Sequence, residues 1–245
     1  MASIRSLDIL DIARALGQAP FHATPTTVAN WIEEQYSSTS GGGFNYDPAI
    51  SATFDAFRGG HTFESATKYC LENGNPKGRK QNASAIRAIM PYALSHPSIC
   101  YRIGLTAVAI GRYSGRTVYA KIKAPMVRVE GQSAFLVMPG YRMSFRPSDI
   151  AIDLACSIAL ETCAQGDLSV ADFEYLYAGP GPDTKGRMFQ AIQGKDRHRY
   201  SREQINRLLE IFVAGVEQAS RLGLDQKAPN LNGYRIIDPN APGLF

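Results

Sequence analysis

The sequence contains no long apolar run. No stretch approaches the roughly 18 consecutive apolar residues that a membrane-spanning helix needs. The N-terminal segment also differs from a signal peptide, because Asp8 and Asp11 stand where the apolar region of such a peptide would be. We therefore expect a cytoplasmic protein with no membrane partner.

Cysteine and histidine are few and scattered. The four cysteines have no Cys-x-x-Cys pair, and the four histidines are isolated from other ligand types at metal spacing. Cys156 and Cys163 are seven residues apart in an expected helix, so they share one face and are expected to be buried and unreactive. This pattern fits a reducing compartment and predicts neither a metal nor a cofactor.

Recognisable catalytic motifs are also missing. Residues 179–187 resemble a phosphate-binding loop, but the spacing is wrong and the prolines remove amides that such a loop needs. There is no G-x-S-x-G or H-E-x-x-H motif. The expected strands hold only one acid, Glu130, whereas a metal-dependent nuclease needs several. The motifs therefore do not identify a function. The functional hypotheses below are based on the placement of charge.

What is present is the composition of an ordinary folded protein. The chain has 245 residues, of which 44% are hydrophobic and 20% charged, with a net charge of +4. These values exclude collagen, coiled coil and extended disorder. The length permits one large core or two small ones.

Residues 1–98 have the periodicity of helices. The apolar spacing predicts helices over 4–16, 25–36, 48–57, 62–72 and about 81–94, the last of them kinked near Pro91. The segment 37–43 (SSTSGGG) is typical of a flexible loop.

Residues 99–147 have the pattern of short strands. Segments 101–113, 117–123, 126–130, 134–138 and 141–145 are separated by turn residues, which predicts an antiparallel meander. Helices are expected again over 149–165, 168–177 and 202–222. The first begins at Ser148, and the last opens with a capping box at Ser201.

These patterns predict an α+β fold. A helical N-terminal half would be followed by a central antiparallel meander and by C-terminal helices packed on that sheet. Regions 1–98 and 99–245 are candidate domains, although they can also form one continuous domain. The nearly all-apolar helix over 149–165 is expected to cover the apolar face of the sheet.

Charge is sharply segregated along the chain. Residues 99–147 have a net charge of +7, residues 148–183 a net charge of −7, and residues 184–207 a net charge of +5. Strand alternation would place one apolar and one basic face on the sheet. The expected basic face carries Lys121, Lys123, Arg128 and Arg142.

Two basic loops stand before expected helices. The first carries Lys77, Arg79 and Lys80, and the second carries Arg197, His198, Arg199 and Arg202. A helix N-terminus next to basic side chains is a suitable site for an anion. We expect both loops to border the basic face.

Two kinds of partner can balance this charge. The acidic segment 148–183 can neutralise the sheet internally, and solvated lysines on an open sheet are also common. An external polyanion, DNA or RNA, would instead bind through phosphate contacts.

The leading hypothesis is a cytoplasmic nucleic-acid-associated binding protein. One alternative is an enzyme acting on a phosphorylated or other anionic substrate. Another is a protein-interaction module, such as a toxin-like inhibitor or an adaptor, that docks an acidic protein partner.

Overall fold

The computed structural model describes residues 3–37, 44–182 and 186–238. The helices in these ranges are α1 (Ile9–Leu16), α2 (Pro25–Ser37), α3 (Asp47–Phe57), α4 (Phe63–Glu72), α5 (Arg79–Ser95), α6 (Asp149–Cys163) and α7 (Arg202–Arg221). The strands are β1 (Ser6–Asp8), β2 (Ile99–Arg102), β3 (Leu105–Tyr113), β4 (Arg116–Ile122), β5 (Met126–Glu130), β6 (Ser133–Gly140), β7 (Asp172–Tyr177), β8 (Gln190–Gln193) and β9 (Tyr234–Ile237).

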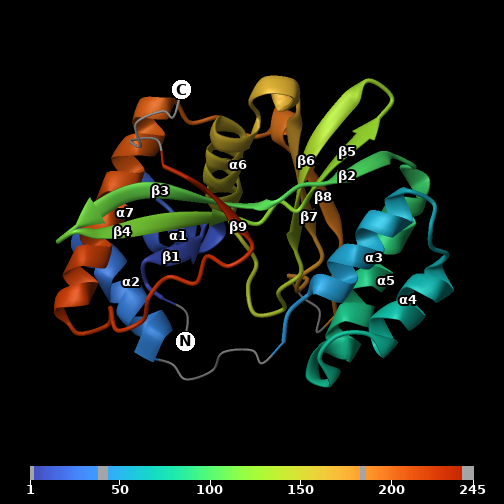
Figure 1. Cartoon of the computed structure of the whole chain (residues 1–245), viewed down its shortest axis with the longest axis horizontal. Helices are drawn as coiled ribbons and strands as arrows, with labels where there is room; N and C mark the ends of the chain where they lie inside the picture. Colours follow the sequence, from blue (N-terminus) through green and yellow to red (C-terminus); the bar gives the residue numbers. More distant parts are fainter. Residues whose placement is uncertain (1–2, 38–43, 183–185, 239–245) are drawn as a thin grey trace.

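The strands form two mixed sheets. The four-stranded sheet has the order β1-β4-β3-β9, and the five-stranded sheet has the order β2-β5-β6-β7-β8. The pairs β1–β4, β3–β9 and β6–β7 are parallel. In Figure 1, helices α1, α2 and α7 lie with the smaller sheet and α3, α4 and α5 with the larger one, while α6 stands between the two sheets. The fold is therefore α+β, as the sequence predicts.

The prediction of one antiparallel meander is wrong. The chain crosses from the five-stranded sheet to the other sheet between β2 and β3, and it crosses back between β4 and β5. Ser114 and Gly115 have φ angles of 47° and 73°, so a tight turn closes the β3–β4 hairpin. A hydrophobic pattern identifies strands, but it does not say which strands pair.

Three segments have a different structure from the predicted one. Residues 6–8 form a strand instead of the first turns of a helix, and α1 begins only at Ile9, after the N-cap residue Asp8. Residues 172–177 form strand β7, where a helix was predicted. Residues 141–145 form no strand and lead into α6. Distant pairing accounts for the first two segments, since β1 lies beside β4 and β7 lies parallel to β6.

The remaining helix predictions are confirmed to within a few residues. The capping box at Ser201 is present, because the Ser201 side chain accepts from the Gln204 amide and the Gln204 side chain accepts in return from the Ser201 amide. Pro91 lies inside α5. The predicted loop at 38–43 lies outside the described residues, and the domain boundary near residue 98 stays a prediction.

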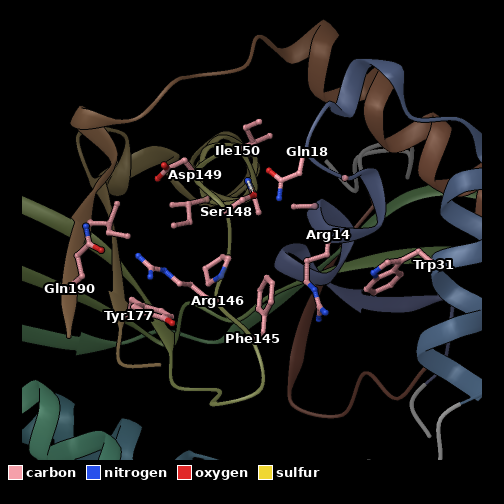
Figure 2. A pocket seen from close by; sticks show the side chains of 16 residues that line it. Arg14, Gln18, Trp31, Phe145, Arg146, Ser148, Asp149, Ile150, Tyr177 and Gln190 are labelled. Carbon is pink, nitrogen blue, oxygen red and sulfur yellow. Dashed lines mark hydrogen bonds between the residues drawn. The ribbon is translucent and has the colours of Figure 1, made fainter. Parts of the chain in front are cut away.

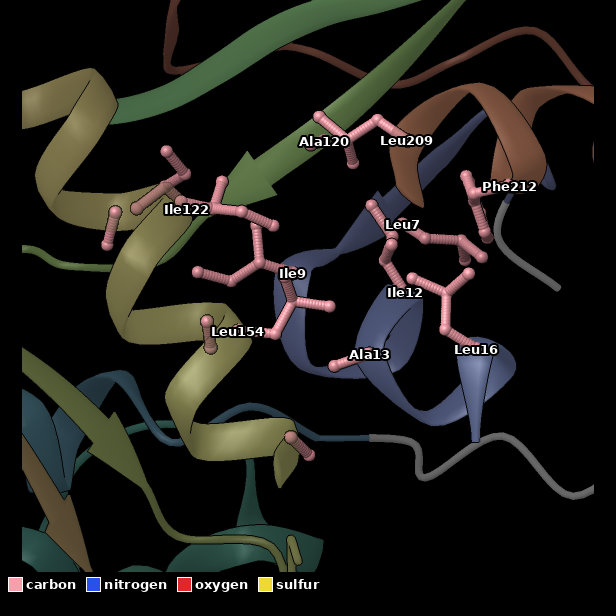
Figure 3. Packing of buried hydrophobic residues seen from close by; sticks show 14 of the residues in the cluster. Leu7, Ile9, Ile12, Ala13, Leu16, Ala120, Ile122, Leu154, Leu209 and Phe212 are labelled. Carbon is pink, nitrogen blue, oxygen red and sulfur yellow. The ribbon is translucent and has the colours of Figure 1, made fainter. Parts of the chain in front are cut away.

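The central strands of the five-stranded sheet are buried on both faces. On one face, α6 belongs to a core with the side chains Leu136, Met138 and Phe173. On the other face, α3, α4 and α5 cover Met126, Val137 and other residues. The first core also extends to α1, α7 and β4, as Figure 3 shows around Ile9, Ile122 and Phe212. Cys156 is fully buried in this core, whereas Cys163, at the end of α6, is only half-buried.

Burial on both faces corrects the position expected for Arg128. This residue does not lie on an exposed basic surface, because its side chain is 0% exposed beneath α3 and α5. Its guanidinium forms a bidentate pair with Glu174, which is also 0% exposed, with both N–O distances 2.6 Å. The alternation predicted on β5 is right, but helices cover the face that was expected to be open.

Every donor of Arg128 has an acceptor. Besides the two bonds to Glu174, the guanidinium donates to Glu130 at 2.6 Å, to Ser98 at 3.2 Å and to the Tyr92 hydroxyl at 3.2 Å. Tyr92 in turn donates to Glu174 at 2.7 Å. The pair spans β5 and β7 across the intervening strand β6, so it fixes the arrangement of all three strands.

The Arg128→Met variant should lose about 3–5 kcal/mol of unfolding free energy, because Glu174 would remain buried without its counter-charge. Urea denaturation measures the loss. The midpoint should fall while the m value stays unchanged, because only the stability changes. The double variant Arg128→Met/Glu174→Leu should recover much of it, since neither charge then stays unpaired. Equal losses in the single and double variants would contradict this account.

Candidate anion-binding site

The candidate site lies where two parallel strands end. Strands β6 and β7 are neighbours and are joined through α6, so their carboxyl ends meet beside the N-terminus of that helix. Ligands of α/β units commonly bind at this edge. Here a pocket of about 700 Å³ opens between the β6–α6 connection and helices α1 and α2. Its lining includes Arg14, Gln18, Trp31, Phe145, Arg146, Ser148, Asp149, Ile150, Tyr177 and Gln190 (Figure 2).

Aromatic rings and guanidinium groups alternate along the pocket. The guanidinium carbon of Arg14 lies 4.0 Å from the ring centroid of Phe145 and 5.5 Å from that of Trp31. In Figure 2 the side chain of Phe145 lies on the side of Arg14, and that of Arg146 extends toward Tyr177. Arg146 is exposed and forms no ion pair within the described part of the chain. The positive charge of Arg146 is therefore available to a ligand.

Tyr177 closes the side of the pocket near the end of β7. Its hydroxyl donates to the carbonyl of Pro180 at 2.7 Å. Burial raises the pKa of Tyr177, although Arg146 and Arg187 oppose the rise. The side chain is therefore neutral at physiological pH and presents an uncharged ring to the pocket.

The N-terminus of α6 contributes backbone donors. The Ser148 side chain accepts from the amide of Ala151 at 3.2 Å, so the amides of Asp149 and Ile150 keep no acceptor inside the helix. The Asp149 carboxylate would repel an anion, but Arg197 lies 3.0 Å from it. Arg197 also contacts Asp153 at 2.6 Å. Arg197 therefore shares its one positive charge between two carboxylates, which reduces the repulsion that an anion would meet at this helix start without abolishing it.

Three of the predicted sheet residues meet in a charged cluster beside the pocket. The cluster consists of Lys121, Lys123, Arg142, Asp8 and Asp11. Lys123 lies 3.5 Å from Asp8, and Arg142 lies 3.2 Å from Asp11. Because the pocket residue Arg14 also donates to Asp11, at 3.3 Å, one carboxylate connects the cluster to the pocket.

The acids that compensate this cluster differ from those expected. Asp8 and Asp11 come from the N-terminal segment and not from the acidic segment 148–183. Lys121 has an aromatic neighbour instead, because its ammonium group lies 5.3 Å from the ring centroid of Tyr234. Internal acids therefore balance Lys123 and Arg142, and Lys121 keeps its charge next to a ring.

Burial perturbs two groups of the cluster in opposite directions. Burial raises the pKa of Asp8, and Asp11 adds to the rise, while Lys123, Arg142 and the bond from the Leu10 amide oppose it. Burial and the neighbouring charge of Lys123 lower the pKa of Lys121. Perturbed groups gathered next to a pocket are typical of functional sites.

The two basic loops lie in different places. Lys77, Arg79 and Lys80 stand at the start of α5 and do not line the pocket. The loop with Arg197 and Arg199 lies on α6, since Arg197 binds Asp149 and Arg199 lies 3.5 Å from the Cys156 sulfur.

The other two predicted residues of this second loop lie close by. His198 is exposed, and its ring lies edge-on to that of Tyr200. Arg202 pairs with Glu161 at 3.3 Å. The second loop therefore borders the pocket through Arg197 and Asp149, whereas the first does not.

The sequence prediction missed five residues of the pocket. Arg14, Trp31 and Tyr177 were assigned to helices and Phe145 to the strand 141–145, while Arg146 was counted in the basic charge of residues 99–147 without being named as a site residue. The clue for Phe145 and Arg146 was their place just before the capped helix at Ser148, where a strand-to-helix connection would form a binding edge. Nothing local in the sequence identified the other three.

Comparisons with known proteins identify no family. No family model matches the chain, and no curated protein matches it. A solved structure described as the crystal structure of SSO0001 is similar over 93% of this chain and 80% of that chain, with 12% identity and a TM-score of 0.35. Likeness at this level supports no argument about function.

Two kinds of feature are absent from the residues that the structure describes. None of their helices combines the length and apolar character that crossing a membrane requires. Nor do these residues place three or more His, Cys, Asp or Glu side chains where they could share a metal ion.

The raised pKa of Asp8 predicts a specific pH dependence. Folded protein keeps the Asp8 proton at pH values where the unfolded chain, with a pKa of about 3.9, has released it. Unfolding free energy should therefore contain a component that falls as pH rises from about 4 through the raised pKa.

The Asp8→Asn variant should lack this component and still cap α1, because an asparagine oxygen can accept from the Leu10 amide as Asp8 does at 3.0 Å. Chemical denaturation at several pH values measures how the unfolding free energy of each protein depends on pH. Asp55→Asn, which removes an exposed carboxylate on α3, is the control. A wild-type pH profile in Asp8→Asn would contradict the assignment.

Proposed function

We propose that this protein binds a nucleotide unit, meaning a phosphate with its attached base, in the pocket beside α6. The observation that carries the proposal is the pair Phe145 and Arg146, which brings a ring and an uncompensated guanidinium into one pocket at the start of a helix. This pocket offers separate groups for the two chemical parts of such a ligand.

The phosphate has three kinds of donor available. Arg146 supplies a guanidinium without an ion-pair partner in the described residues, and guanidinium groups bind phosphate oxygens in bidentate fashion. The free amides of Asp149 and Ile150 point out of the N-terminus of α6, where the helix dipole favours an anion. The guanidinium of Arg14 lies across the pocket and can also donate, although its charge is already shared with Asp11 at 3.3 Å.

The base has aromatic surfaces available. Trp31, Phe145 and Tyr177 all line the pocket. Stacking of a base on an aromatic side chain contributes about 1–3 kcal/mol and tolerates any base, because every base has a π-face. We therefore expect binding that requires a base and a phosphate but depends little on which base is present.

Internal ion pairs favour this local mode of binding over a broad basic surface. Lys123, Arg142 and Arg197 already have acidic partners, and Arg128 is buried. The same pairing reduces support for docking of an acidic protein. A free nucleotide and one unit of a nucleic acid share the required chemistry, and the titrations below separate the two sources.

The Arg146→Ala variant should bind a nucleoside 5′-monophosphate about 10- to 100-fold more weakly than the unchanged protein, as expected for loss of a charge-assisted hydrogen bond of about 1.5–3 kcal/mol. Isothermal titration with AMP and UMP at low salt measures this. The unphosphorylated nucleosides should bind more weakly than the nucleotides, and added salt should weaken nucleotide binding.

Lys68→Ala is the matched control for loss of a positive charge, because Lys68 is 74% exposed on α4, which contributes no residue to the pocket. This variant should bind nucleotide normally. Equal affinities of Arg146→Ala, Lys68→Ala and the unchanged protein would refute the proposed phosphate contact. Equal affinities for nucleoside and nucleotide would also refute it.

A further inference from the structure

Building on the proposed function, we propose that the ligand is a single-stranded nucleic acid whose next nucleotides leave the pocket over a second aromatic surface. We call this surface the aromatic ridge and define it by Phe21, His198, Arg199 and Tyr200. It deepens the proposal by naming the class of ligand that supplies the nucleotide unit.

The ridge repeats the chemistry of the pocket. The rings of Phe21 and Tyr200 have centroids 5.8 Å apart, and those of His198 and Tyr200 lie 4.9 Å apart at an interplanar angle of 88°. Phe21 is 38% exposed, although it is a large apolar side chain, and His198 and Arg199 are exposed beside it. Exposed rings next to a guanidinium are the groups that bind unpaired bases and the backbone of a single strand.

Two chain connections place the ridge at the rim of the pocket. Phe21 follows the pocket residue Gln18 by three positions, so their Cα atoms are at most about 11 Å apart. On the other side, Arg197 binds the pocket residue Asp149 at 3.0 Å and directly precedes His198. One segment of the ridge therefore begins three residues after a lining residue, and the other begins next to a residue that is bonded to one.

The ridge is held in place before any ligand binds. The Tyr200 amide donates to the Ser157 hydroxyl at 3.0 Å, and Arg197 donates to Asp153 at 2.6 Å. Both acceptors belong to α6, the helix whose N-terminus forms part of the pocket. Groups that are already fixed cost little entropy to order on binding, so the ridge and the pocket can act together on one strand.

An unpaired strand fits these surfaces better than a duplex does. Bases inside a duplex are stacked on each other and offer no faces to protein rings, whereas single-stranded bases stack directly on aromatic side chains. Pocket and ridge together supply several stacking positions. Affinity should therefore rise with the number of nucleotides until the ridge is filled.

Fluorescence anisotropy can test this with labelled oligo(dT) of two, four, six and twelve nucleotides, the matching duplex, and dTMP as competitor. We expect the six-nucleotide strand to bind at least tenfold more tightly than dTMP, and the duplex to bind more weakly than that strand. The Phe21→Ala variant should weaken binding of the six-nucleotide strand about 5- to 100-fold, which corresponds to one lost stacking contact. Affinity for dTMP should not change.

Phe63→Ala is the matched control, because Phe63 is 37% exposed and lies on α4. Its affinities for both ligands should equal those of the unchanged protein, and thermal melting should show that both variants fold. Binding of dTMP without any gain from longer strands would overturn this inference and leave the nucleotide pocket standing. An equal effect of Phe21→Ala and Phe63→Ala would also overturn the inference, and failure of every ligand to bind would overturn both proposals.

Discussion

The buried pair Arg128–Glu174 is the interaction on which the arrangement of the larger sheet depends. A charge taken out of water costs several kcal/mol, and this cost is offset only when the partner charge and the remaining hydrogen bonds are all in place. Here all five guanidinium donors have acceptors, and the ring of Phe135 on the intervening strand lies 4.3 Å from the guanidinium carbon. The pair therefore selects one register of β5, β6 and β7.

That register determines the position of the candidate site. Because β6 and β7 are parallel, the chain must cross over through α6, and this crossover brings the N-terminus of α6 to the carboxyl ends of both strands. Residues 141–148 then connect β6 to α6 and carry Phe145 and Arg146 into the pocket. A substitution that loosened the buried pair would thus shift residues of the pocket, although Arg128 and Glu174 are not among its lining residues.

Sequence patterns predicted the helices well because those patterns are local. The apolar stripe of α7 and its capping box at Ser201 lie within one segment, and so do the apolar residues of α6. Strands β1 and β7 were missed because their conformation depends on partners more than thirty residues away, β4 and β6. The alternation on β5 was right, yet it could not reveal that helices from the N-terminal half cover the face that bears Arg128.

The candidate site was predicted only in part, because most of its residues also meet through distant pairing. Lys121, Lys123 and Arg142 do come together, as the charge pattern suggested, but Asp8 and Asp11 meet them only through the pairing of β1 with β4. The pocket collects side chains from Ala13 to Ile192, and no local motif connects them. The net charge of a sequence segment therefore did not show which basic side chains lack an ion-pair partner. Arg146 remains available because it forms no ion pair with an acid of the described residues.

The most direct test uses the single tryptophan of the chain, Trp31, which lines the pocket. Titration with a nucleoside monophosphate should quench or shift the fluorescence of Trp31 in a saturable way, with a midpoint that agrees with the calorimetric affinity. A nucleotide that binds by calorimetry but leaves the fluorescence of Trp31 unchanged throughout saturation would show that it binds elsewhere, and would contradict the account.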